Sequence, residues 1–275
     1  MTDRTIVELA PAKLNLALHV RRRRPDGYHD LETLFAFCRD GDVIRLAPTA
    51  ADSFTITGPF GATLAAEGDN LVTRARDAFR ATFGATEPCA IELEKNLPIA
   101  SGIGGGSADA AATLRALARR HDVASDDPRL FDIAARLGAD VPACLLGKSA
   151  IGEGRGDELR TVAGLTGRGV LLVNPRVAVS TARVFAGWDG VDRGPIAEDP
   201  AQGRNDLTAP AVAAAPEIAD VLDALDALAG ARLVRMSGSG ATCFALFDTP
   251  ADARFAAAEI GAERRGWWAL ASEVA

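Results

Sequence analysis

A glycine-rich segment near the middle of the chain constrains the fold most strongly. It reads Leu-Pro-Ile-Ala-Ser-Gly-Ile-Gly-Gly-Gly-Ser and spans residues 97–107. After Ser107 the apolar residues Ala110, Leu114 and Leu117 recur at helical spacing, so a loop leads into the N-terminus of a helix. The first N–H groups of a helix have no internal partner and carry the positive end of the helix dipole, and glycines let a phosphate come close to them. The segment therefore predicts a phosphate-binding loop, with a tight structural turn as the alternative.

The two common phosphate-loop motifs do not fit this chain. The Gly-Lys-Ser tripeptide at residues 147–149 has Pro142 where a Walker A loop requires its first glycine. The dinucleotide fingerprint requires glycine or alanine where Ser107 stands. The loop therefore predicts a nucleotide-binding protein of another family and argues against a dehydrogenase.

Composition limits the classes of partner. With 275 residues, 48% hydrophobic and 24% charged, the chain predicts a soluble protein of one large or two modest domains. A formal net charge of −7 argues against nonspecific binding to nucleic acid or to an anionic membrane. The first five residues do not resemble a signal peptide and no long apolar run follows, so we expect a cytoplasmic protein. Its four scattered cysteines lack a Cys-x-x-Cys pair and indicate buried thiols rather than a zinc site or a disulfide framework.

Alternating and helical apolar patterns predict a mixed helix and strand protein. Strands are expected at residues 5–10, 13–20, 42–46, 53–57, 89–94, 169–173, 232–236, 242–247 and 267–274. Helices are expected at residues 71–83, 107–118, 128–137, 181–188, 218–228 and 251–260. Asp69 or Asn70 can cap the first of these helices, and Pro142 biases Val141 toward an extended conformation. A glycine-rich stretch near residue 150 marks a junction, which predicts domains at residues 1–153 and 154–275.

Several polar residues stand where function is possible, each with a structural alternative. Lys13 and Asn15 share one face of a strand, although strand lysines are commonly exposed. Tyr28 and His29 follow a Pro-Asp-Gly turn, where an aromatic ring and a histidine could stack on a base and bond its edge or could simply pack. Asp140 lies between a helix end and a proline, where a turn aspartate is the simpler interpretation. The arginine run at residues 21–24 is interpreted as a solvated hairpin end, with attraction of substrate phosphate as the alternative.

Three motifs in a fixed order resemble those of one superfamily. They are Pro-Ala-Lys-x-Asn at residues 11–15, the glycine loop of residues 97–107, and Ser-Gly-Ser-Gly-Ala at residues 237–241. Together they resemble the GHMP kinases, a superfamily of small-molecule kinases. The stretches at residues 24–31, 137–142 and 153–156 narrow the resemblance to the branch whose acceptor is a CDP-linked methylerythritol in the non-mevalonate isoprenoid pathway.

This resemblance implies an α+β fold of two domains, an S5-domain-2-like N-terminal half that binds ATP and a ferredoxin-like C-terminal half on the substrate side. It implies ATP-dependent phosphorylation of the acceptor's 2-hydroxyl, with Mg²⁺ carried in on ATP and no metal-ligating residue assigned. The loop has glycines at positions 105 and 106 where most of the superfamily has serines, and its serine comes later, at Ser107. A small-molecule acceptor is the expected partner, without nucleic acid or membrane, and the chain is expected to be a monomer or a weak homodimer.

The resemblance also implies a role for individual residues. Asp140 would accept the proton of the acceptor hydroxyl and Lys13 would hold that hydroxyl. Tyr28 and Phe185 would sandwich the cytosine, His29 would bond its edge, and Asn15 would hold the methylerythritol. The ATP phosphates would lie against Pro98, Ala100, Gly102, Gly104, Gly105, Gly106 and Ser107, and the site would be closed by Gly238 and Gly240.

Two other functions remain open at this point. A kinase for a smaller acceptor, such as mevalonate or homoserine, would keep the phosphate loop but offers no base to stack against Tyr28 and Phe185. A nucleotide-binding module without catalysis would make Lys13 and Asp140 structural residues.

Overall fold

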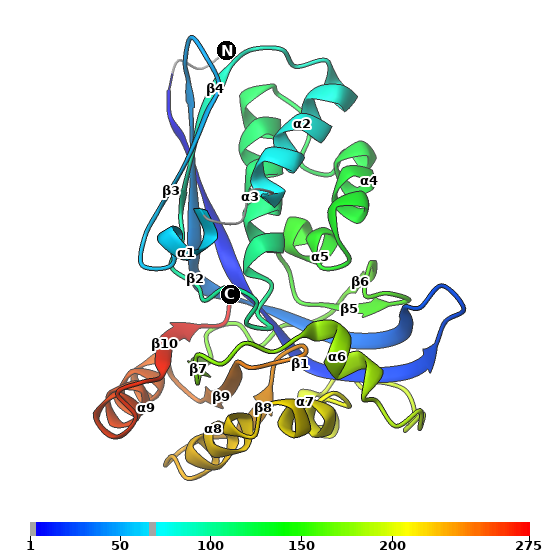
Figure 1. The fold of residues 1–275 in the computed structure, drawn as a ribbon, viewed down its shortest axis with the longest axis vertical. Helices are drawn as coiled ribbons and strands as arrows, with labels where there is room; N and C mark the ends of the chain where they lie inside the picture. Colours follow the sequence, from blue (N-terminus) through cyan, green and yellow to red (C-terminus); the bar gives the residue numbers. More distant parts are fainter. Residues whose placement is uncertain (1–3, 66–69) are drawn as a thin grey trace. The chain divides into compact units, whose positions relative to one another are not determined.

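The chain forms an α+β protein whose helices and strands divide into two compact units (Figure 1). The computed structural model describes residues 4–65 and 70–275, so the expectations that rest on Met1–Asp3 and on Asp69 as a cap lie outside the described residues. Unit 1 comprises Met1–Ala12, Asp40–Ile99 and Gly104–Gly147, and unit 2 comprises Lys13–Arg39, Ala100–Ile103 and Lys148–Ala275. Each unit is described by itself below. Which domain binds ATP and which the acceptor stays a prediction.

Two long strands contribute residues to both units. They are β1 (Ile6–Arg23) and β2 (His29–Pro48). The sequence predicted two separate strands around Pro11, but β1 runs through it. Pro11 is tolerated there because β1 pairs in a ladder with β2 alone among the described strands, so one missing N–H donor leaves no central ladder broken.

Unit 1 combines strands with a group of helices. Its further elements are β3 (Ser53–Thr57), α1 (Gly61–Ala65), α2 (Leu71–Phe83), β4 (Cys89–Glu94), α3 (Gly105–Arg120), α4 (Pro128–Leu137) and α5 (Val141–Leu146). Strand β4 pairs antiparallel with β2, with Val43 opposite Glu94, and parallel with β3, with Ser53 opposite Ala90. Helix α3 contacts α2, α4 and α5, and its run of buried alanines lets these helices approach closely.

The ends of the helices follow local chemistry. The side chain of Asn70 accepts a hydrogen bond from the Val72 N–H at 2.8 Å, which confirms it as the cap of α2, and Gly84 ends this helix in the left-handed conformation. The expected extended conformation at Val141 is wrong, because Val141–Leu146 forms α5 with Pro142 in its first turn. A proline is favourable in a first turn, where its missing N–H would have no helical partner.

Unit 2 is built around an antiparallel sheet of strand order β10-β7-β9-β8. Its elements are β5 (Ala150–Glu153), β6 (Glu158–Thr161), β7 (Gly169–Asn174), α6 (Thr181–Ala186), η1 (Pro200–Gln202), α7 (Thr208–Ala214), α8 (Glu217–Asp226), β8 (Leu233–Met236), β9 (Cys243–Phe247), α9 (Pro250–Glu263) and β10 (Trp268–Glu273). The order from β7 through α8, β8, β9 and α9 to β10 is the split βαβ arrangement of ferredoxin-like domains, as the sequence resemblance implied.

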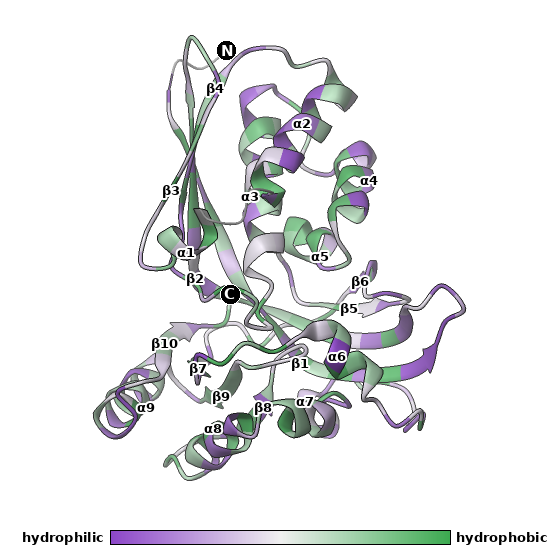
Figure 2. Cartoon of the chain, in the orientation of Figure 1, coloured by the Kyte–Doolittle hydropathy of each residue, from purple (hydrophilic) through white to green (hydrophobic). Residues whose placement is uncertain are grey.

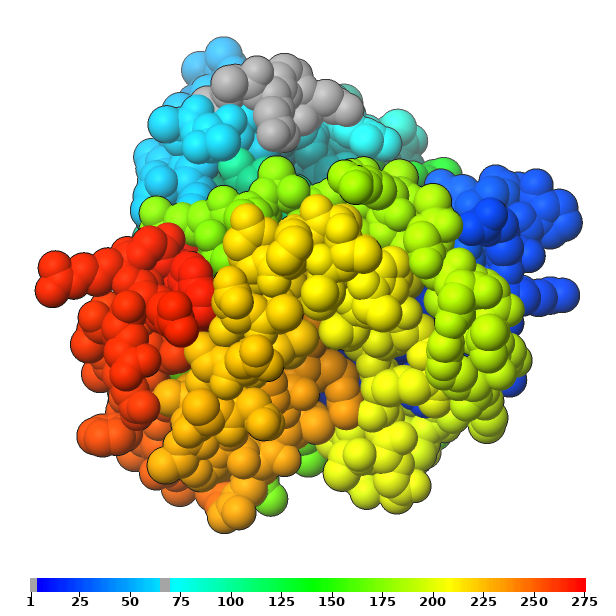
Figure 3. All heavy atoms as spheres, turned by 60° about the horizontal axis from the view of Figure 1, so that its bottom comes forward, coloured from blue at the N-terminus to red at the C-terminus, as the bar shows by residue number. Residues whose placement is uncertain are grey.

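The core of unit 2 lies between this sheet and the helices that cover it. Helix α8 shows hydrophobic and hydrophilic colours around its axis in Figure 2, and its buried residues are Ile218, Val221 and Leu225. They join sheet residues such as Leu171 and Phe247 in one apolar cluster. In Figure 3 the yellow residues of α7 and α8 form much of the surface facing the viewer, beside the orange and red residues of α9. Over residues 4–65 and 70–275 the structure contains no helix with both the length and the hydrophobicity that a bilayer span requires.

Candidate active site

Lys13 and Asn15 begin a buried polar network in unit 2. Both side chains are 2% exposed, so Lys13 is not the exposed strand lysine of the structural alternative. Lys13 Nζ donates to Asn15 Oδ1 at 2.7 Å, and Asn15 Nδ2 donates to Thr33 Oγ1, also at 2.7 Å. Thr33 in turn donates to the carbonyl of Ala17 at 2.8 Å. The network fixes the orientation of the Asn15 amide, because only its oxygen can accept from an ammonium group.

The second glycine loop adjoins this network. Ser237 Oγ accepts from the Asn15 N–H at 3.1 Å and donates to the Gly102 carbonyl at 3.0 Å. Gly102 and Gly238 both have positive φ, and a Cβ on Gly102 would come within 2.5 Å of the Ser237 carbonyl oxygen. Gly240 has positive φ as well, and its Cβ would come within 2.8 Å of Met236 Sδ. The structure thus brings together, inside unit 2, parts of all three motifs that carried the family resemblance.

An aromatic cluster lies at the start of β2. His29 is buried, and its ring centroid lies 5.1 Å from that of Phe185 on α6 and 5.8 Å from that of Trp188. Tyr28 is 56% exposed, and the guanidinium of Arg155 lies 5.6 Å from its ring centroid. In the described residues the Tyr28 ring makes no contact with the Phe185 ring. The predicted cytosine sandwich between them stays a prediction.

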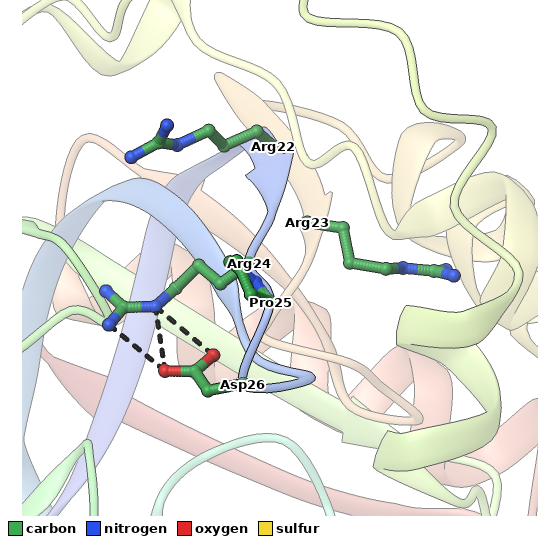
Figure 4. A pocket seen from close by; sticks show the side chains of 5 residues that line it. All are labelled: Arg22, Arg23, Arg24, Pro25 and Asp26. Carbon is green, nitrogen blue, oxygen red and sulfur yellow. Dashed lines mark hydrogen bonds and ion pairs between the residues drawn. The ribbon is translucent and has the colours of Figure 1, made fainter.

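The arginine run is an exposed hairpin end in which acidic partners balance much of the charge. Arg22 and Arg24 both pair with Asp30, at 2.5 Å and 3.0 Å, and Arg24 also pairs with Asp26 at 3.1 Å. Residues 22–26 line an open pocket, shown in Figure 4. Arg23 takes no part in these ion pairs and extends to the opposite side of the hairpin from Arg24 (Figure 4).

The predicted phosphate loop is divided between the two units. Ala100 and Gly102, both with positive φ, lie in unit 2, whereas Pro98 and the residues from Gly104 onward lie in unit 1. Gly104 is the N-cap of α3, so this helix begins at Gly105, two residues before the predicted start. The N–H groups of Gly105, Gly106 and Ser107 therefore belong to the first turn, where a helix has no backbone acceptors for them. Gly106 is exposed. This geometry suits a phosphate.

A buried ionic cluster lies beneath the start of α3. Lys95 Nζ donates to Asp42 Oδ2 at 2.5 Å and to Asp109 Oδ2 at 2.7 Å. Asp42 Oδ1 also accepts from the Leu97 N–H at 2.8 Å. A Cβ on Gly105 would come within 3.0 Å of Lys95 Nζ, so the cluster fills the space under the first turn.

The buried environment shifts the pKa of two groups in this cluster. Burial raises the pKa of the Asp109 carboxyl to about 8, against the opposing effect of Lys95. Burial lowers the pKa of Lys95, but the Asp109 and Asp42 carboxylates outweigh it, so that its pKa is raised. Asp109 Oδ1 has no hydrogen-bond partner among the described residues. The cluster was not predicted, because its members come from β2, from the residue that follows β4 and from α3, and no local sequence pattern links them.

Asp140 is the N-cap residue of α5 and is half-buried. Its carbonyl accepts from the Cys144 N–H at 3.1 Å, but within the described residues its side chain makes no cap hydrogen bond to this helix. The part that this carboxylate plays stays a prediction.

Three residues with a part in these arrangements were not predicted. Ser237 belongs to a motif that sequence analysis did recognise, and its hydroxyl next to Gly238 was the available signal. Thr33 stands in unremarkable local sequence, and only its contact with Asn15 distinguishes it. Arg23 belongs to the arginine run that the sequence singled out, but its contact with His29 was not predicted. Over the described part of the chain, no group of three or more His, Cys, Asp or Glu side chains is arranged to hold a metal ion.

Comparison with known proteins identifies the family. The model of the GHMP kinases N terminal domain matches residues 70–148, and that of the GHMP kinases C terminal domain matches residues 195–265. A protein of Rhizorhabdus wittichii named 4-diphosphocytidyl-2-C-methyl-D-erythritol kinase is 54% identical over 97% of this chain and 94% of its own length. A relative of the same name from Agrobacterium fabrum is 47% identical over 95% of this chain and 94% of its own length.

The solved structures agree with the sequence relatives. A crystal structure of 4-(cytidine 5'-diphospho)-2C-methyl-D-erythritol kinase superposes with a TM-score of 0.82 at 37% identity and covers 98% of this chain and 99% of its own. The homoserine kinase of Cytophaga hutchinsonii superposes with a TM-score of 0.71 over 100% of this chain and 96% of its own, at 18% identity, and so shares the fold. The motifs, the two-unit α+β architecture and these relatives lead to one conclusion: the chain belongs to the GHMP kinases, in the family of its relatives named 4-diphosphocytidyl-2-C-methyl-D-erythritol kinase.

Proposed function

We propose that this chain transfers a phosphoryl group from ATP to the 2-hydroxyl of 4-diphosphocytidyl-2-C-methyl-D-erythritol. The named relatives at 47–54% identity support this acceptor. The observation in the structure that carries the acceptor class is the His29–Phe185 pair, two rings from distant parts of the chain with centroids 5.1 Å apart. An aromatic ring and an imidazole edge are suited to a flat, polar base, which neither mevalonate nor homoserine has.

In this proposal the residues of unit 1 handle ATP and the proton. The loop that includes Pro98 and runs from Gly104 to Ser107 holds phosphate through N–H groups at the start of α3. Asp140 accepts the proton of the attacking hydroxyl, the task of a carboxylate general base. Mg²⁺ would be bound through the ATP phosphates, whose charge it would neutralise.

The residues of unit 2 bind the acceptor. Lys13 contributes a positive charge that holds the acceptor hydroxyl, and Asn15, fixed by Thr33, holds the methylerythritol. Tyr28 and Phe185 contact the faces of the cytosine, and His29 bonds its edge. Ala100 and Gly102 contact the ATP phosphates, and Gly238 and Gly240 close the loop around the transferred group. Because phosphoryl transfer has a loose transition state, these positioning and electrostatic tasks account for most of the catalysis required of the protein.

The test of this function is an acceptor competition. The purified chain is given ATP and Mg²⁺ with the CDP-linked methylerythritol, mevalonate or homoserine, and ADP release is measured. We expect turnover with the cytidine compound alone. Turnover with another acceptor alone would show that the proposed substrate is wrong. ATP binding without turnover of any acceptor would favour a nucleotide-binding module without catalysis.

The role of Asp140 gives a separate prediction. Replacing it as Asp140→Ala removes the proton acceptor, so kcat with the cytidine compound should fall by about 10²- to 10⁴-fold. The matched control is Asp132→Ala, an exposed aspartate on α4 of the same unit, which should retain its activity. An Asp140→Ala enzyme with normal turnover would exclude Asp140 as the base.

A further inference from the structure

Arg23 contacts the ring edge of His29. Its Nε–H donates to His29 Nε2 at 3.4 Å, and its Nη2 donates to the carbonyl of Ala186, also at 3.4 Å. Ala186 ends α6, the helix that carries Phe185. Figure 4 shows the Arg23 side chain on the side of the hairpin away from Arg24. A guanidinium can only donate, so the His29 nitrogen that it faces must carry a lone pair and no proton.

The rest of the imidazole is held by apolar neighbours. The rings of Phe185 and Trp188 lie at interplanar angles of 36° and 85° to it, and His29 is 7% exposed. Burial lowers the pKa of His29, and the positive charge of Arg23 lowers it further. The neighbouring carboxylate of Asp30 is engaged by Arg22 and Arg24. The ring is therefore neutral at pH 7, with its single proton on Nδ1.

We propose that Arg23 is a positioning residue that holds His29 as the neutral Nδ1–H tautomer, so that this N–H is presented to an acceptor atom of the bound pyrimidine. Cytosine offers two such atoms, O2 and N3, on the edge that a donor can reach. No described residue forms a hydrogen bond with His29 Nδ1, so the donor is available for a ligand. The pyrimidine rests on the proposed function, whereas the tautomer is a property of the free chain and can be tested without any turnover.

The first test reads the tautomer directly by ¹⁵N-detected NMR of the histidine side chains. The chain has three histidines, so variants assign the signals. His19 is an internal reference, because its Nε2 accepts from the Arg204 N–H at 3.3 Å and its Nδ1 faces the Gly194 carbonyl at 3.1 Å. We expect His29 to show an unprotonated Nε2 and a protonated Nδ1, with a pKa below 6.5. A protonated Nε2 in the neutral ring would overturn the proposal.

Variants of Arg23 then separate positioning from folding. In Arg23→Ala the Nδ1–H preference should be lost and the pKa of His29 should rise, whereas Arg23→Lys, which keeps a cationic donor, should restore part of both. The matched control is Arg22→Ala, which removes the neighbouring arginine, whose side chain is 77% exposed, and leaves the His29 contact intact. An unchanged His29 tautomer in Arg23→Ala would also refute the proposal.

Kinetics connect the tautomer with recognition. We expect Arg23→Ala to raise KM for the cytidine acceptor by about tenfold, the effect of one misoriented hydrogen bond, with kcat and KM for ATP little changed. Arg22→Ala should leave all three constants near their original values. If the tautomer changes in Arg23→Ala but KM for the acceptor does not, His29 Nδ1–H does not contribute to acceptor binding, and that part of the proposal is wrong. No turnover in the unsubstituted chain, with the tautomer as expected, would instead count against the proposed function.

Discussion

At the residue scale, the orientation of the buried polar side chains of the site is fixed by the hydrogen bonds that they must form. Asn15 is almost fully buried, and each end of its amide is bound, the oxygen by Lys13 and the nitrogen by Thr33. A buried polar atom without a partner destabilises the fold by about 1–3 kcal/mol, so such positions tolerate few exchanges. The alternation of β1 predicted that Lys13 and Asn15 share a face, but Thr33, on another strand, could be found only in the structure.

The hydroxyl of Thr33 should therefore stabilise the protein as well as orient Asn15. Thr33→Val keeps the shape and removes the hydroxyl, leaving Asn15 Nδ2 and the Ala17 carbonyl without this partner. We expect a loss of about 1–3 kcal/mol in the free energy of unfolding, measured by urea denaturation. Thr33→Ser keeps the hydroxyl and serves as the control. Equal stability of the valine variant and the original chain would show that the hydroxyl contributes nothing to the fold.

At the scale of the element, two separate requirements favour glycine at position 105, the first residue of α3. Gly105 gives a first-turn N–H group to the predicted phosphate site, and its missing side chain leaves room for Lys95 Nζ, which a Cβ would approach to 3.0 Å. The sequence indicated only the first constraint. The second depends on Lys95 and Asp42, which are distant in the sequence and which the pairing of β2 with β4 holds together.

The buried Asp109 makes part of the stability depend on pH. Because its pKa is raised from 3.8 to about 8, the folded chain holds a proton that the unfolded chain releases, and this contribution falls as pH rises through that window. Asp109→Asn stays neutral at every pH. Relative to the original chain, the free energy of unfolding of this variant should increase as pH rises from about 4 to about 8.

Urea unfolding at several pH values measures this difference. Asp132→Asn, an exposed position on α4, should follow the original chain at every pH. Parallel profiles for Asp109→Asn and the original chain would mean that Asp109 is ionised in the folded state throughout the range.

At the scale of the whole molecule, the cysteines are buried in both units. Cys38, Cys89, Cys144 and Cys243 are all buried free thiols, which confirms that expectation from the sequence. Burial raises the pKa of the Cys89 and Cys243 thiols, and a thiol is much less reactive than its thiolate.

Thiol labelling therefore reports on the integrity of the entire fold. A thiol reagent should label none of the four cysteines rapidly in the folded protein and all four after unfolding in denaturant, with mass spectrometry to count the adducts. The denatured sample is the control for reagent and stoichiometry. Rapid labelling of any one cysteine in the folded protein would show that its surroundings open locally.

By itself, the sequence determined many of the elements and the chemistry-bearing motifs, because these depend on neighbours within a few residues. The strand alternation of β1, the Asn70 cap, the glycine loop before α3 and the Ser-Gly-Ser-Gly turn all follow from local periodicity and turn chemistry, and the order of the motifs indicated the family. Only the tertiary structure decided which distant groups complete each arrangement, such as Thr33 on Asn15 and Arg23 on His29. Those contacts, like the Lys95 cluster beneath Gly105, provide hydrogen-bond partners for buried polar groups. The partners lie far away in the sequence, so only the folded chain shows which residues they are.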